Sequence, residues 1–177
     1  MKIRNAQGFA LIDMIFVSGI VGLLCGIALP NLLRAKQSAG AASAIGTLRA
    51  INSAELTYAL TCGSGFYAPD LPTLGTAPPG SIEPFISPDL GNAGATATKS
   101  GYLIRLEGTP YAGAPATCNG LAVGDAAQGF KAAADTTMPP YARFFGTNAS
   151  GTIYEDTASL WGAMPEVDAP LSGSPLH

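Results

Sequence analysis

Residues 9–29 read FALIDMIFVSGIVGLLCGIAL, a run of twenty-one residues with a single charged side chain, Asp13. A helix rises about 1.5 Å per residue, so this run would span roughly 30 Å, the hydrocarbon thickness of a bilayer. Lys2 and Arg4 precede the run, and Pro30 follows it. The stretch therefore predicts a helix that can cross a membrane.

Three kinds of segment share this composition. A secretory signal peptide has an apolar core of about 7–15 residues, whereas this run is longer and contains a carboxylate. An ordinary single-pass anchor, held by Lys2 and Arg4, leaves Asp13 unexplained, since a carboxylate facing lipid costs roughly 2.5–3.5 kcal/mol. In the third reading, cleavage between Gly8 and Phe9 creates a cationic α-amino group one helical turn from Asp13. That amine, from the same chain or a neighbouring one, would neutralise the carboxylate.

The stretch QGFALIDMIFVSGIVGLLCGIALPNLL resembles the class III leader and N-terminal helix of type IV pilins and type II secretion pseudopilins. The resemblance is carried by a short basic leader ending in Gly8, by Phe9, by the acid Asp13 and by Pro30. It implies that a prepilin peptidase cuts after Gly8 and methylates the new N-terminal Phe9. Two residues depart from the family pattern. Ala10 stands where Ser or Thr is usual, and Asp13 where Glu is usual.

The resemblance also implies a fold, a location and partners. The expected fold is α+β and pilin-like, with one long N-terminal helix packed on a small antiparallel sheet of about three to four strands. The expected location is the bacterial inner membrane, with the rest of the chain outside the cytoplasm, and then a periplasmic or cell-surface filament. The implied partners are copies of the chain, other pilin-like subunits, prepilin peptidase and the inner-membrane assembly machinery. Asp13 and Pro30 would serve assembly, and small residues would allow close helix approach, namely Gly19, Gly22, Gly26 and Ala28.

The composition divides the chain into six segments. They are a leader (1–8), a transmembrane or filament-core half-helix (9–30), an amphipathic half-helix (31–60), a Pro- and Gly-rich connection (61–100), an antiparallel sheet (101–155) and a C-terminal tail (156–177). Helix-favouring residues continue beyond Pro30, so we expect this proline to kink the helix rather than end it. Arg49 and Glu55 are expected on faces other than the apolar one.

The second half of the chain predicts short strands and turns. Prolines exclude a long helix from 61–100, and scattered apolar residues indicate an ordered connection with short helical turns, one of them around 82–87. Alternation predicts strands at 101–108, 128–135 and 142–156. The last of these is either one bent strand or a tight hairpin with its turn at Asn148–Gly151. Trp161 and Met164 are expected to dock on the sheet, and the final residues to form a loose tail.

The three cysteines have different expected roles. Cys62 and Cys118 would both lie outside the cytoplasm after insertion, where disulfides persist. A bridge between them would close a loop of about 57 residues and contribute roughly 4 kcal/mol, the alternative being two free thiols. Cys25 lies in the apolar run and is expected to be a small buried hydrophobe.

Neither catalysis nor nucleic-acid binding is expected. The net charge of -3 gives no electrostatic case for binding nucleic acid, and the 47% hydrophobic content excludes a disordered chain. The chain has one histidine, His177, at its last position, so no Ser/His/Asp or Cys/His nucleophile can be built. Calcium is the one cofactor with candidate ligands, but these acids lack EF-hand spacing and no cofactor is expected. They are Glu155, Asp156, Glu166 and Asp168.

Two functions of different classes therefore remain. The first is a structural subunit of a type IV pilus-like filament or a type II secretion pseudopilus, and the sequence does not separate these two. The second is an extracytoplasmic binding module on an ordinary anchor. Its site would use aromatic side chains, with the candidates Tyr67, Tyr111, Tyr141 and Trp161.

Overall fold

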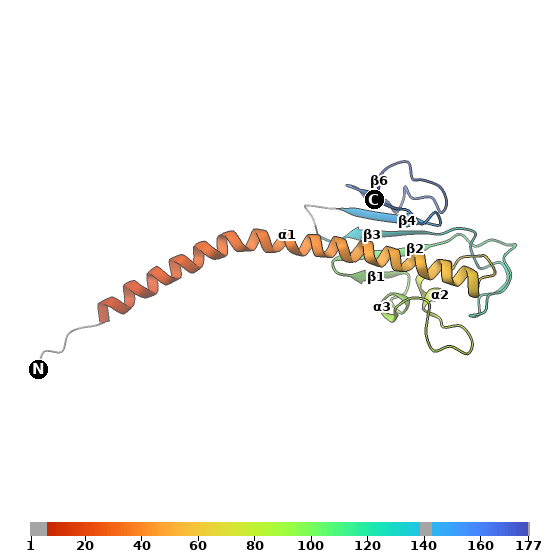
Figure 1. The fold of residues 1–177 in the computed structure, drawn as a ribbon, viewed down its shortest axis with the longest axis horizontal. Coiled ribbons are helices and arrows are strands. Elements are labelled where there is room, and N and C mark those ends of the chain that lie inside the picture. The colour runs from red at the N-terminus through yellow and green to blue at the C-terminus, as the bar shows by residue number, and fades with distance from the viewer. Residues whose placement is uncertain (1–6, 139–142, 177) are drawn as a thin grey trace, which may run out of the picture. The chain divides into compact units, whose positions relative to one another are not determined.

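The computed structural model describes residues 7–138 and 143–176, with side chains from residue 11 onward. The chain divides into two units, Met1–Ser38 and Ala39–His177, and we call the second unit the head. The elements in chain order are α1 (Gln7–Thr61), α2 (Leu71–Gly75), α3 (Pro88–Gly91), β1 (Thr96–Lys99), β2 (Tyr102–Glu107), β3 (Lys131–Thr136), β4 (Phe144–Asn148), β5 (Ile153–Asp156) and β6 (Ser174–Pro175) (Figure 1). The predicted α+β class, one long N-terminal helix with a small antiparallel sheet, is confirmed.

Helix α1 runs for 55 residues with Pro30 inside it. Proline removes one helical hydrogen bond, but helix-favouring residues stand on both sides, so the helix continues through it as expected. The helix ends at Thr61, where Gly65 donates its N–H to the Ala59 carbonyl at 2.8 Å. Gly65 has φ +93°, a left-handed conformation that costs glycine little, and this lets the chain turn away from the helix.

The sheet has six antiparallel strands in the order β1-β2-β3-β4-β5-β6. The expectation of three to four strands is therefore wrong in number. The three expected stretches correspond to β2, β3 and the β4–β5 pair, whereas β1 and β6 add short strands at the two edges. The stretch 142–156 contains a hairpin, because β4 pairs with β5 and Gly151 donates to the Asn148 carbonyl at 2.9 Å in the turn.

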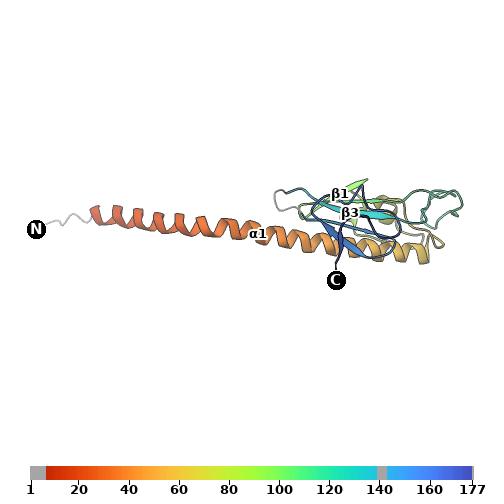
Figure 2. The same ribbon diagram turned by 90° about the horizontal axis from the view of Figure 1, so that it is seen from above.

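The main core of the head lies between α1 and one face of the sheet (Figure 2). Strand residues alternate between the faces, so Ile104 and its cross-strand partner Ala134 point to the core, while Arg105 and its partner Ala133 point away. Helix and sheet approach closely at Gly40, where an added Cβ would lie 2.8 Å from the Ser100 carbonyl oxygen. The large side chains with no exposed surface in this core include Leu48, Ile51, Tyr58, Ile104 and Phe145.

The C-terminal segment covers the opposite face of the sheet. Leu160 is fully buried and Met164 nearly so, and both lie close to Gly146 of β4, where an added Cβ would stand 3.2 Å from the Cβ of Leu160. The guanidinium of Arg105 lies 4.5 Å from the centroid of the Trp161 ring. Trp161 and Met164 therefore dock on the sheet as expected. The end of the chain is not loose, since β6 pairs with β5.

The connection 61–100 is ordered and holds two short helices. Asp70 caps α2, its Oδ1 accepting the Thr73 N–H at 2.9 Å. Helices α2 and α3 pack so closely that a Cβ on Gly75 would lie 2.6 Å from the Cα of Gly91. The short helical turn expected around 82–87 lies instead at the positions of these two helices. The spacing of the prolines therefore indicated short helical turns in this connection but not the residues that form them.

Candidate functional site

The first candidate site is the apolar segment, residues 11–33 of α1. Its large apolar side chains are exposed, from 46% for Ile20 to 74% for Met14. Asp13 is the one charged residue of this segment, and its side chain is also exposed. By length and composition, α1 could span a membrane. Such an uncovered surface is stable only in lipid or against other apolar helices.

Two polar side chains of the apolar segment are hydrogen-bonded within the helix itself. Ser18 Oγ donates to the Met14 carbonyl at 2.6 Å, and Asn31 Nδ2 donates to the Ile27 carbonyl at 3.1 Å. Such bonds to the preceding turn satisfy the polar groups without water. Among the described residues, the Asp13 carboxylate takes part in none of the ion pairs.

The expected processing site lies at the limit of the described chain. Gly8 and Phe9 have helical backbone at the start of α1, and the side chain of Phe9 lies outside the described part of the chain. The basic leader residues 1–6 also lie outside them, so cleavage and methylation stay predictions. Cys25, expected to be buried, is exposed in the single chain together with its apolar neighbours.

Cys62 and Cys118 form a disulfide, which is the predicted pairing, with Cα atoms 4.9 Å apart. The bridge joins the end of α1 to the long loop between β2 and β3. Asn119 reinforces this junction, because its Nδ2 donates to the Thr73 carbonyl at 2.8 Å and its Oδ1 accepts from the Tyr58 hydroxyl at 3.3 Å. The helix end, α2 and the loop are therefore fastened at one place.

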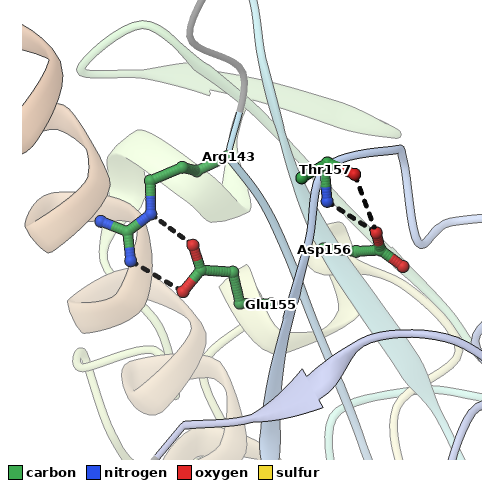
Figure 3. A network of polar contacts seen from close by, with 4 residues as sticks. All are labelled: Arg143, Glu155, Asp156 and Thr157. Carbon is green, nitrogen blue, oxygen red and sulfur yellow. Dashed lines mark hydrogen bonds and ion pairs between the residues drawn. The ribbon is translucent and has the colours of Figure 1, made fainter.

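Two of the acids considered as calcium ligands, Glu155 and Asp156, have protein partners for their carboxylates (Figure 3). Arg143 binds Glu155 through two nitrogens, its terminal nitrogen lying 2.7 Å from Glu155 Oε2, and this hydrogen bonding lowers the pKa of Glu155. The Thr157 N–H donates to Asp156 Oδ1 at 2.6 Å and is the main cause of the lowered pKa of Asp156. Glu155 is therefore held as half of an ion pair.

The other two candidate ligands lie in the C-terminal segment. Glu166 Oε1 accepts the Thr109 N–H at 2.8 Å, and Asp168 offers its backbone carbonyl to Asn148 Nδ2 at 2.6 Å. Across the described ranges 7–138 and 143–176, no three His, Cys, Asp or Glu side chains form a group that could hold a metal ion. Asn148, at the start of the expected turn, is fully buried, and its Oδ1 accepts the Ser150 N–H within that turn.

The aromatic side chains proposed for a binding module have separate surroundings. Tyr67 packs on Phe130 with ring centroids 5.2 Å apart, and Tyr111 stacks on Phe66 at 5.9 Å. The ring of Trp161 packs against the cationic groups of Arg105 and Lys131, on the face of the sheet that points away from α1. Tyr141 lies outside the described residues. A pocket of about 290 Å³ borders Tyr67, and its lining contains no acid, cysteine or histidine.

Sequence reasoning missed one unusual group, Glu55. The carboxyl group was expected on a polar face, but the side chain is fully buried in the core. Burial is the main cause that raises its pKa to about 8; the Ala68 N–H opposes the shift and the charge of Asp70 adds to it. A signal was present in the sequence, because the spacing i, i+4, i+7 places Glu55 between Ile51 and Tyr58 on the apolar stripe.

The fold and the apolar segment define a class: an α+β protein with a long apolar N-terminal helix that could span a membrane. A scan against protein-family models and searches of curated proteins and of solved structures found no match to this chain.

Proposed function

We propose that this chain is a structural subunit of a type IV pilus-like filament or a type II secretion pseudopilus. Prepilin peptidase cuts the precursor after Gly8 in the inner membrane and methylates Phe9. The mature chain then polymerises with copies of itself and other pilin-like subunits through its apolar N-terminal helix, with the head outside the cytoplasm.

The observation that carries this proposal is the apolar segment with its single acid. Large side chains on every face of residues 11–33 are exposed, so lateral packing of many such helices would bury a large apolar area. Asp13 is the one charge in that surface, and a new amine at Phe9 is the complementary group that cleavage would supply. The pair would fix the register between neighbouring helices.

Processing is tested by sequencing the N-terminus of the membrane-bound protein in its native host. We expect the mature chain to begin at N-methylated Phe9. Gly8→Val places a branched side chain next to the cut bond and should leave the precursor whole. A wild-type chain that keeps Met1 would refute the processing step. If that chain were also monomeric, the result would favour a binding module on an ordinary anchor.

Assembly is tested with two substitutions at Asp13. Asp13→Asn keeps the shape of the side chain but removes its charge, so the amine of Phe9 would be left unpaired in an apolar core, at a cost of roughly 3–5 kcal/mol. We expect normal membrane insertion and cleavage but a large loss of chain from the sheared filament fraction. Asp13→Glu keeps the charge and should retain assembly. Normal filaments from Asp13→Asn would refute the register role.

A further inference from the structure

Glu55 is a carboxyl group enclosed in the core of the head. Its side chain has no exposed surface, its Oε2 accepts the Ala68 N–H at 2.9 Å, and its Oε1 is buried with no hydrogen-bond partner among the described residues. Burying a charged carboxylate with an unsatisfied oxygen costs far more than burying the neutral acid. The geometry therefore favours the protonated form.

The segment that Glu55 holds is a joint between three parts of the head. Residues 66–69 follow the end of α1, and Tyr67 exchanges two backbone hydrogen bonds with Ala127, at 2.8 and 3.0 Å. The Pro69 carbonyl accepts from the Gly108 N–H at 2.9 Å. Between these bonds, the N–H of Ala68 turns back to α1 and donates to Glu55. Among the described residues, this is the one hydrogen bond between the segment and α1, and it adds to the apolar packing of Ala68 in the core.

The negative charge of Asp70 opposes the ionisation of Glu55. Asp70 lies just before α2 and raises the pKa of Glu55 by its negative charge, while Tyr58 is the acid one turn further along α1. The head cations that form ion pairs in the described chain pair with other acids. They are Lys99 with Asp89, Arg105 with Asp135, Lys131 with Glu107 and Arg143 with Glu155. Burial, joined by this unfavourable field, raises the pKa of Glu55 to about 8.

We propose that Glu55 is a proton-operated latch that fastens the segment 66–69 to helix α1. When the carboxyl is protonated the latch is closed. When it loses the proton to solvent, the Ala68 N–H alone does not compensate for the buried charge and the unpaired Oε1, so the carboxylate gains water only when the segment moves away and this N–H is released. Because Cys62 and Cys118 remain bridged beside it, the opening stays local to this joint. The latch does not depend on cleavage or assembly.

The sign of the pH effect follows from the two pKa values. The folded-state pKa of about 8 lies above the ordinary value of 4.5, so the folded head binds a proton that the unfolded chain releases between these values. The stabilisation is fully present below pH 4.5 and is lost as the pH rises through 8. The latch is therefore closed in acidic and neutral surroundings and opens in alkaline ones.

The first test measures the titration directly on the full chain in detergent micelles, with ¹³C at the glutamate carboxyl carbons. Of the five glutamates in the sequence, we expect one, Glu55, to have a pKa of about 8. Glu55→Gln should remove the high-pH signal, and Glu83→Gln, at an exposed position, should leave that signal unchanged. Titration of all five below pH 6 would overturn the proposal without requiring any variant to fold.

The second test asks whether ionisation opens the joint. Amide exchange at Ala68, corrected for its intrinsic rate, should become about tenfold less protected between pH 7 and pH 9, because about one carboxyl in eleven stays protonated one unit above its pKa. Glu55→Gln mimics the neutral acid and should abolish this change. If Ala68 is equally protected at both pH values in the wild-type chain, Glu55 is a buried acid but not a latch.

Discussion

Replacing both Cys62 and Cys118 with alanine should lower the free energy of unfolding of the head by about 4 kcal/mol. The two cysteines are 56 residues apart in the sequence, and the structure joins them beside the end of α1. For a closed loop of about this length, the loss of chain entropy in the unfolded state corresponds to about 4 kcal/mol at 25 °C. The head has about 140 residues. At about 2.1 cal/mol/K of unfolding entropy per residue, the melting temperature should fall by about 14 °C.

The measurement uses the full chain in detergent micelles, with the fluorescence of Trp161 as the signal for unfolding. Trp161 is the one tryptophan of the sequence, and it lies in the head against Arg105 and Lys131, so its emission should change when the sheet opens. Cys25→Ser is the matched control, because that cysteine is outside the bridge and should leave the melting temperature unchanged. Reductant should lower the melting temperature of the wild-type chain but not that of the double variant.

Two results would refute this reasoning. If the double variant melts within about 3 °C of the wild-type chain, the bridge does not restrict the unfolded state as the loop length requires. If peptide mapping without reductant finds Cys62 and Cys118 unlinked in the folded chain, the pairing itself is wrong. A smaller slope in the urea titration of the double variant would instead indicate a more compact unfolded state.

Three substitutions test the packing of the head. Gly46→Ala should stabilise the head by up to about 1 kcal/mol, because a Cβ there meets nothing within 4 Å and alanine favours helix. Gly40→Ala should destabilise the head, because its Cβ would press against the Ser100 carbonyl. Thermal melts of the two variants should therefore shift the melting temperature in opposite directions. Asn148→Ala should lower the free energy of unfolding by about 1–3 kcal/mol, because two backbone carbonyls of the C-terminal segment lose their amide donor. An unchanged midpoint in a urea titration would contradict this role of Asn148.

The long helix could be predicted from the sequence because its determinants are local. The apolar run 9–29 and the helix-favouring residues beyond Pro30 indicate a helix from their own composition and spacing, without reference to the rest of the fold. Alternation also located β2, β3 and the hairpin of β4 and β5, because each of these strands places apolar side chains on one face. The pairing of Cys62 with Cys118 followed from their number and their expected location.

The edge strands and the C-terminal segment could not be predicted in the same way. Strand β1 has four residues, of which Ala97 alone is buried, and β6 has two residues and includes Pro175. Neither carries a periodic apolar signal, and each becomes a strand because a neighbouring strand offers it backbone partners. The tail is ordered for a related reason, since Leu160 and Met164 find the outer face of a sheet that the sequence alone does not locate.

The sequence by itself determined the membrane-type helix, the α+β class and the position of the one acid in the apolar run, because composition and spacing along the chain encode these properties. The tertiary structure alone decided the surroundings of Glu55. Its position on the helix stripe was available from the sequence, but its burial depends on the segment 66–69 folding back over α1 and donating the Ala68 N–H. The pKa of a carboxyl group is set by the water and charges that surround it in space, and residues distant in sequence supply those surroundings.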